Sequence, residues 1–133
     1  MATGREEHAE RLSHRSSFGK DLARRSKSKC ELCETSGVKL GVFEVPPEQS
    51  IPTIERCVLL CERCIEQISN PKRFESGEQW RCLQQAAWSE IPAVQVLSVR
   101  LLRRQADSED WARETLEGLF LDEDVEEWAG EAE

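Results

Sequence analysis

Cys30-Glu31-Leu32-Cys33 and Cys61-Glu62-Arg63-Cys64 are the two stretches that decide the fold of this chain of 133 residues. Each is a C-x-x-C pair, and together they supply four thiolates, the ligand set that a structural zinc ion takes with tetrahedral geometry. A site closed by four protein ligands leaves no position open for water or a substrate. The spacing therefore predicts one structural zinc ion with four ligands: Cys30, Cys33, Cys61 and Cys64.

Two disulfides, or a redox-active C-x-x-C pair, are the alternatives to a metal site. A redox motif has no need of a second copy, and nothing in the sequence suggests secretion. Met1 is soon followed by Gly4-Arg5-Glu6-Glu7, which is not an apolar signal sequence, and no apolar run is long enough to span a membrane. We therefore expect a cytoplasmic protein without membrane contacts, whose reduced thiols are available to a metal.

The segment between the two pairs carries the pattern of a β-hairpin. Apolar residues alternate within residues 38–45, Pro46-Pro47 end that strand, and residues 57–60 form a second apolar run. Residues 62–69 then suit a helix that begins at the second pair. Each C-x-x-C pair with its tight turn is called a knuckle. The order knuckle, hairpin, knuckle, helix is typical of a treble-clef zinc finger. A zinc ribbon, which lacks the last helix, remains the alternative.

The composition favours a small metal-bound domain with a thin core, since 38% of the residues are hydrophobic and 33% are charged. We predict an α+β chain in which a mainly α-helical region follows the finger. Four parts are expected along the chain: a flexible basic arm (residues 1–25), the four-cysteine zinc finger (26–70), a helical extension packed on the finger (71–129) and a frayed tail (130–133).

Helices are predicted from capping residues and from apolar spacing. Residues 20–25 of the arm suit a short helix. In the extension, a helix over residues 79–88 is expected to have an apolar face made of Trp80, Leu83, Ala87 and Trp88. The expected N-caps of three later helices are Ser89, Ser108 and Asp122.

Several reactive or charged side chains lie outside the four-cysteine set. His8 and His14 are in the basic arm, where we expect both to be solvated. Cys57 is interpreted as a buried or idle thiol, and Cys82 as a small hydrophobic residue packed in a helix. Arg100, Arg103 and Arg104 cluster near the end of the helix expected after Ser89. Positive charge is ordinary at a helix C-terminus, so this cluster needs no ligand to explain it.

The net charge of −8 is divided unevenly along the chain. Residues 1–29 carry eight Lys and Arg against four Asp and Glu, a net charge of +4. Residues 30–104 carry nine against ten, and residues 105–133 carry one against twelve, a net charge of −11. The arm favours nucleic acid, whereas the acidic, Trp-bearing C-terminal third repels phosphate and favours a basic protein partner.

Several stretches of this sequence, from about Ser26 to Ala129, resemble the PhnA-like proteins of bacteria. They are Cys30-Glu31-Leu32-Cys33, Phe43-Glu44-Val45-Pro46-Pro47, Leu59-Leu60-Cys61-Glu62-Arg63-Cys64, Trp80-Arg81-Cys82-Leu83, Trp88-Ser89-Glu90-Ile91-Pro92-Ala93-Val94-Gln95-Val96, Leu119-Phe120-Leu121-Asp122 and Glu127-Trp128-Ala129. The resemblance implies a zinc-binding N-terminal module whose ligands are the same four cysteines. The sequence departs from the family pattern in three ways. Glu34 stands where a glycine usually follows the first knuckle, Cys57 is an extra thiol, and the chain ends at Glu133 without the second PhnA domain of longer members.

The family name suggests phosphonate metabolism, but the residues do not suit a hydrolase, which would need a nucleophile and two metals held by His and Asp. HNH nucleases resemble the expected layout and carry paired histidines on the strand after the first knuckle. This chain has Glu44-Val45-Pro46-Pro47 there, so a general base of that type is missing. We therefore expect a non-catalytic interaction or accessory module with a protein partner. A nucleic-acid-binding zinc finger and a phosphonate-linked protein are the alternatives.

Overall fold

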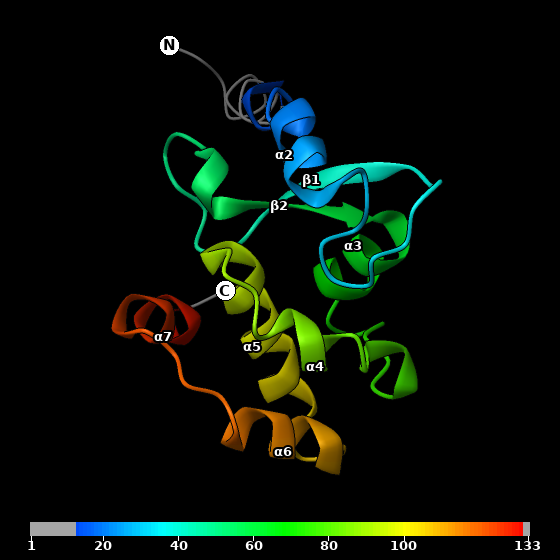
Figure 1. Cartoon of the computed structure of the whole chain (residues 1–133), viewed down its shortest axis with the longest axis vertical. Helices are drawn as coiled ribbons and strands as arrows, with labels where there is room; N and C mark the ends of the chain where they lie inside the picture. The colour runs from blue at the N-terminus through cyan, green and yellow to red at the C-terminus, as the bar shows by residue number, and fades with distance from the viewer. Residues whose placement is uncertain (1–12, 132–133) are drawn as a thin grey trace.

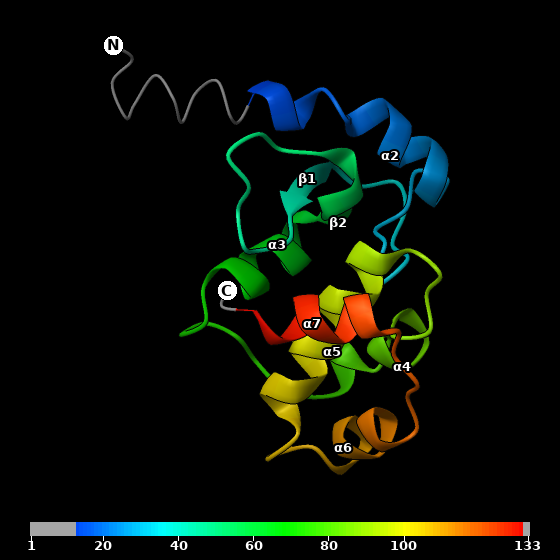
Figure 2. The same ribbon diagram turned by 90° about the vertical axis from the view of Figure 1, so that its left-hand side faces the viewer.

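The computed structural model describes residues 13–131 and has an α+β fold, as the sequence predicts. The described elements, shown in Figures 1 and 2, are α2 (Gly19–Ser26), β1 (Leu40–Glu44), β2 (Cys57–Cys61), α3 (Glu62–Ser69), α4 (Leu83–Ala86), α5 (Pro92–Gln105), α6 (Asp110–Glu117) and α7 (Glu123–Gly130), with short 3-10 turns at Ile54–Arg56 and Glu78–Trp80. None of the helices in this part of the chain is long and apolar enough to cross a membrane. His8 lies outside the described residues.

The hairpin predicted between the two knuckles is confirmed. Strands β1 and β2 pair antiparallel, with Leu40 opposite Cys61 and Glu44 opposite Cys57. Every residue of β2 is buried, and side chains alternate between its two faces. Val58 and Leu60 join the main core, whereas the opposite face of β2 meets Leu22 of α2. The strand is therefore covered by helices on both sides, which explains its continuous apolar sequence.

Helix α5 is the central element of the extension. It packs on α4, α6 and α7 and also contacts β2 (Figures 1 and 2). The predicted caps need two corrections. The N-cap of α5 is Ile91, whose N–H donates to Ser89 Oγ at 3.1 Å, so Ser89 forms a turn before the helix rather than its cap. The N-cap of α6 is Glu109 and not Ser108, while Asp122 is at the N-cap position of α7 as expected, although its side chain makes no capping hydrogen bond.

The predicted helix over residues 79–88 is confirmed only in part. A 3-10 turn occupies Glu78–Trp80, and only Leu83–Ala86 is α-helical. The apolar face is also incomplete, because Trp88 follows the end of α4 and leaves 55% of its surface exposed. Trp80, Leu83 and Ala87 are buried.

A junction of hydrogen bonds joins the finger to the extension. The guanidinium of Arg100 on α5 donates to the carbonyls of Pro46, Trp128 and Ala129. The indole Nε1–H of Trp128 also donates to the Pro46 carbonyl at 3.0 Å, and Arg56 lies over its ring at 4.5 Å. The end of β1, the middle of α5 and the end of α7 therefore meet at one carbonyl oxygen.

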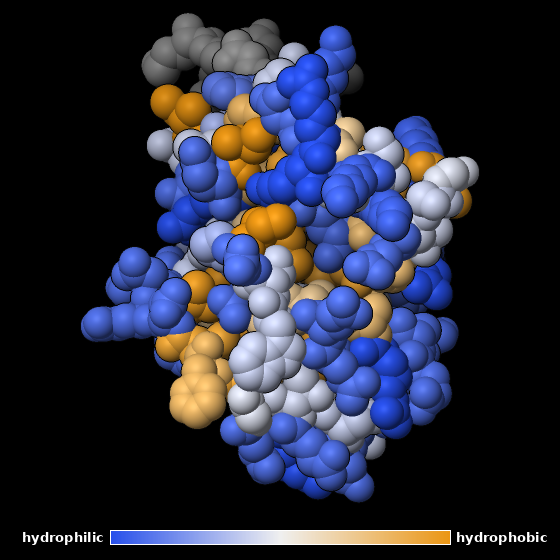
Figure 3. All heavy atoms as spheres, viewed as in Figure 1, coloured by the Kyte–Doolittle hydropathy of each residue, from blue (hydrophilic) through white to orange (hydrophobic). Residues whose placement is uncertain are grey.

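Three of the four tryptophans are in the core, and the exposed aromatic side chains are elsewhere. Trp80, Trp111 and Trp128 are all less than a tenth exposed, so the tryptophans of the acidic C-terminal third are not available on the surface to a partner. Phe120, between α6 and α7, is 90% exposed instead. Figure 3 shows hydrophobic residues breaking the surface along the middle of one face, whereas the end over α6 is hydrophilic.

Candidate metal centre

The structure brings the four cysteines of the two knuckles together. Their sulfur atoms all lie within 4.8 Å of one another, and three of the four residues are buried. The Sγ atoms of Cys30 and Cys64 are 3.8 Å apart, as are those of Cys33 and Cys61. With zinc–sulfur distances of about 2.3 Å, a regular tetrahedron has sulfur–sulfur edges of about 3.8 Å. The donor set and its spacing therefore fit a single tetrahedral metal ion.

The sulfurs are not paired as disulfides. A disulfide bond is about 2.05 Å long, and all six cysteines are free thiols. Each knuckle faces the other through one sulfur–sulfur separation of 3.8 Å, which lies within hydrogen-bonding range for thiols and also matches the edge of a zinc–thiolate tetrahedron. We interpret these separations as edges of a ligand tetrahedron.

The first knuckle is held as a tight turn by its backbone. The N–H of Cys30 donates to the Thr35 carbonyl at 3.0 Å, and the N–H of Glu34 donates to the Cys30 carbonyl at 2.9 Å. Glu34 has a positive φ of 62°, a conformation that glycine adopts most easily. Glu34 therefore occupies a backbone position that suits the glycine of the resembling family.

The second knuckle lies where β2 becomes α3. Cys61 is the last residue of β2 and the N-cap of α3, and Cys64 is in the first turn of that helix. The free N–H groups and the dipole of a helix N-terminus favour thiolate over thiol. The predicted helix over residues 62–69 is confirmed with the same bounds.

Cys30, Cys61 and Cys64 have shifted pKa values. Hydrogen bonding with Cys64 lowers the pKa of Cys30 to about 4, although burial opposes this. The same hydrogen bond and burial raise the pKa of Cys64 far above its ordinary value, and burial raises the pKa of Cys61. A first thiolate thus keeps its neighbours protonated. A divalent metal displaces these protons when it binds, so acid weakens binding.

Cys33 is the most accessible of the four and has two polar side chains beside it. Its Sγ lies 3.1 Å from Thr35 Oγ1. Burial opposes the charge of Arg63, but Cys64 and the other thiolates hold the pKa of Arg63 above its ordinary value, and its guanidinium hydrogen-bonds to Cys33. Arg63 therefore supplies positive charge to a group of sulfurs that would carry a net negative charge even with a divalent ion.

Glu31 is a functional residue that the sequence analysis missed. Its side chain is only 4% exposed and accepts two hydrogen bonds from Arg25 of α2, at 2.7 and 2.9 Å. It also accepts from the Leu59 N–H at 2.8 Å, and Arg25 reaches the Cys57 carbonyl at 3.0 Å. One carboxylate thus ties the first knuckle to both α2 and β2. The single sequence signal for this role of Glu31 was the position of a charged residue between two expected ligands, Cys30 and Cys33.

The two remaining cysteines are separate from the cluster. Cys57 is buried at the far end of β2, opposite Glu44. Four residues of strand place it about 13 Å from Cys61, too far to bind the same ion. Cys82 is half-buried before α4, and burial together with the charges of Cys33 and Cys30 raises its pKa to about 11.

No protein-family model matches this sequence, and no curated protein or solved structure shows a significant similarity to it. The assignment of the site therefore depends on its own geometry.

Proposed function

We propose that this chain is a zinc-binding, non-catalytic interaction module in which one zinc ion is structural. The observation that carries the proposal is the gathering of four cysteine sulfurs within 4.8 Å of one another, with two of their separations at 3.8 Å. Thiolate ligands select zinc over magnesium, calcium and manganese, which prefer oxygen. Four protein ligands fill the coordination of zinc and leave no place for a reacting water.

A treble-clef finger is the arrangement that we favour within this proposal. The hairpin β1–β2 separates the two knuckles, and α3 starts at the second knuckle. A zinc ribbon would not need that helix. The same order, with the stretches of sequence quoted for the PhnA-like proteins and the left-handed backbone at Glu34, supports membership of that family.

The interaction role is supported by the surroundings of the site. The strand position where HNH nucleases carry histidines holds Glu44, which is 3% exposed and accepts from the Gln49 N–H. In residues 13–131 the single histidine is His14, which packs on Phe18 instead. The proposed module therefore acts by binding a protein, with zinc fixing the shape of the surface.

Paired cysteine variants test the zinc assignment. Cys61→Ser removes a ligand, so the protein should lose zinc and unfold its finger, because binding at such sites is worth about 10–16 kcal/mol. Cys57→Ser is the matched control on the same strand and should keep both zinc and fold. Zinc content and circular dichroism measure the two effects. Equal zinc loss in both variants, or turnover of a phosphonate or phosphoester by the pure protein, would contradict the proposal.

Nucleic-acid binding is a second candidate, favoured by the placement of α2. This basic helix lies at one end of the long axis of the molecule, and the acidic helix α6 lies at the other (Figures 1 and 2). The exposed cations Lys20 and Arg24 lie in α2, and Lys27 follows directly after it. Retention on heparin that falls with salt and is abolished by Lys20→Glu with Lys27→Glu would support this role. Failure to be retained at low salt would exclude it.

A further inference from the structure

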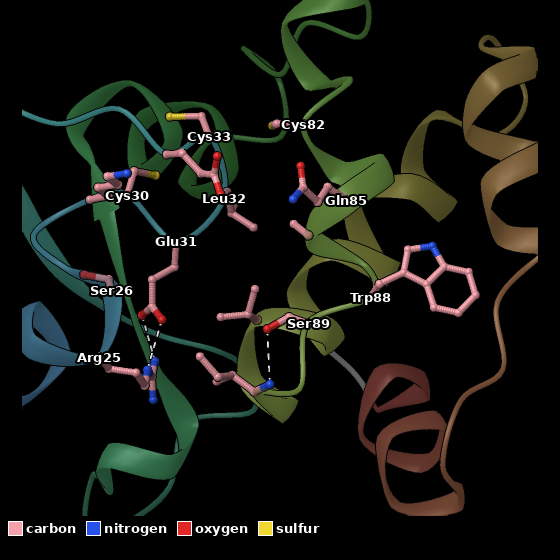
Figure 4. Close-up of a pocket in the computed structure, with 15 residues that line it drawn as sticks. Arg25, Ser26, Cys30, Glu31, Leu32, Cys33, Cys82, Gln85, Trp88 and Ser89 are labelled. Atoms are coloured by element: carbon pink, nitrogen blue, oxygen red, sulfur yellow. Dashed lines mark hydrogen bonds and ion pairs between the residues drawn. The ribbon is translucent and has the colours of Figure 1, made fainter.

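Cys33 is the one cysteine of the four-sulfur cluster that solvent reaches. The other three are at most 5% exposed, whereas Cys33 is half-buried. It borders a groove of about 480 Å³ that lies between the first knuckle and residues 82–94 of the extension (Figure 4). Hydrogen peroxide is little larger than a water molecule, which occupies about 30 Å³, so the groove admits it. A dissolved peroxide therefore meets the sulfur of Cys33 first.

The surroundings of Cys33 suit it to oxidation. A bound divalent metal keeps its cysteine ligands deprotonated, and the thiolate is the form of cysteine that reacts with peroxides. The Arg63 guanidinium hydrogen-bonds to Cys33 and places a positive charge beside it. Cysteines that sense oxidants are typically accessible thiolates with a second cysteine close enough to form a disulfide. Cys33 meets the first condition, and the cluster supplies the second.

The nearby second cysteine is Cys61 of the other knuckle. The Sγ atoms of Cys33 and Cys61 are 3.8 Å apart. Because a disulfide bond is about 2.05 Å long, the two sulfurs need to approach each other by less than about 2 Å to form one. Cys61 is the last residue of β2, so this bond would join β2 to the first knuckle, as the metal does.

Cys82 and Cys57, which are not metal ligands, are less suited to react with Cys33. Cys82 lines the same groove, but Figure 4 shows the sulfur of Cys33 turned away from it. The thiol of Cys82 instead donates to the Gln79 carbonyl within its own turn, at 3.8 Å. Cys57 is fully buried at the opposite end of β2 from Cys61. The geometry therefore favours a bond between the two knuckles.

We propose that the metal centre is a redox switch in which a peroxide oxidises Cys33, Cys61 joins Cys33 in a disulfide and the metal leaves. The proposal rests on the zinc site proposed above. The Cys33 thiolate attacks the O–O bond of the peroxide, which gives a sulfenic acid and releases hydroxide. The Cys61 thiolate then attacks the sulfenic sulfur, forms the S–S bond and releases a second hydroxide. The two thiolates lose two electrons, the peroxide gains them, and the metal keeps only two of its four ligands.

Hydrogen peroxide added to the full, zinc-loaded chain tests the proposal. A chromogenic chelator reports the release of zinc, and mass spectrometry of a proteolytic digest identifies the disulfide. We expect one zinc ion to be released for each bond formed between Cys33 and Cys61, and a thiol reductant with added zinc to restore the site. The oxidised chain should also melt at a higher temperature than a reduced chain stripped by a chelator, because the disulfide still joins the knuckles.

Cys82→Ser and Cys57→Ser are the matched controls, because neither residue belongs to the cluster. Both variants should release zinc at the rate of the parent chain and form the same disulfide. Slower release in the Cys82 variant, a bond from Cys33 to Cys82 or Cys30, or sulfinic acid at Cys33 without a disulfide would overturn the proposal. A zinc-loaded chain that keeps its metal in peroxide refutes the switch alone, whereas a chain that does not bind zinc refutes the proposed function.

Discussion

Cys33 differs from the other three cysteines of the cluster in its exposure and its contacts. It is the one member that is not buried, and it lies between the Thr35 hydroxyl and the Arg63 guanidinium. Hydrogen bonds to a coordinating thiolate lower its tendency to accept a proton and leave the metal. The most accessible ligand is therefore also the one with the most polar side chains beside it.

Removing the guanidinium of Arg63 should loosen the metal. We expect Arg63→Ala to release zinc to a competing chelator about 10-fold faster than the parent protein, because partners of a metal ligand typically contribute 10–100-fold to affinity. The measurement is the rate of zinc transfer to a chromogenic chelator. Arg73→Ala is the control, since Arg73 forms an exposed ion pair with Glu66 at 3.5 Å, away from the cluster. Similar release rates for both variants would show that Arg63 does not support the site.

At the scale of elements, α2 is fixed to the finger by one buried carboxylate and one buried apolar residue. Leu22 is fully buried against β2, and Arg25 pairs with Glu31 inside the first knuckle. These two contacts therefore join α2 to β2 and to the first knuckle. Loss of the knuckle would release the helix from the finger.

Two neighbouring arginines of α2 test this attachment. Arg25→Ala leaves the carboxylate of Glu31 buried without its cation, which should lower the free energy of unfolding by about 2–4 kcal/mol. Arg24→Ala removes an exposed ion pair with Asp21 and should cost no more than about 1 kcal/mol. Chemical denaturation followed by circular dichroism compares the two. Equal effects would mean that the ion pair of Arg25 does not hold α2 in place.

The sequence predicted those elements whose cause is local. The C-x-x-C spacing, the hairpin between the pairs and the helix after Cys61 each follow from residues a few positions apart. Trp88 was misplaced because its burial depends on whether the chain remains helical after α4, which ends at Ala86. The role of Glu31 was missed because Leu59 is 28 residues away in the sequence. The exposure of Trp88 and the hydrogen bonds of Glu31 depend on tertiary contacts, which local sequence patterns do not predict.

At the scale of the whole molecule, the Pro46 carbonyl joins the finger to the extension. Arg100 donates to this carbonyl and to those of Trp128 and Ala129, and the Trp128 indole donates to it as well. The buried cluster that contains Cys61 and Cys64 also continues into α5, α6 and α7. We therefore expect the two parts to unfold together.

A variant of the junction tests this coupling. Arg100→Leu removes the hydrogen bonds that the guanidinium donates to the carbonyls of Pro46, Trp128 and Ala129, which should cost about 2–4 kcal/mol. Zinc release and loss of helical signal should then shift together to a lower temperature. Arg103→Leu, which removes a partly exposed ion pair with Glu126, should shift neither by much. Helix loss at a lower temperature with unchanged zinc release would show that the finger and the extension are independent units.

The most direct test of the account is the metal itself. Native mass spectrometry of the chain purified without added metal gives the number of ions per chain, and X-ray absorption gives their ligands. The account predicts one zinc per chain, bound by four sulfurs at about 2.3 Å, with the thiols of Cys57 and Cys82 still titratable. A chain without metal, or zinc with nitrogen or oxygen ligands, would contradict the four-cysteine site.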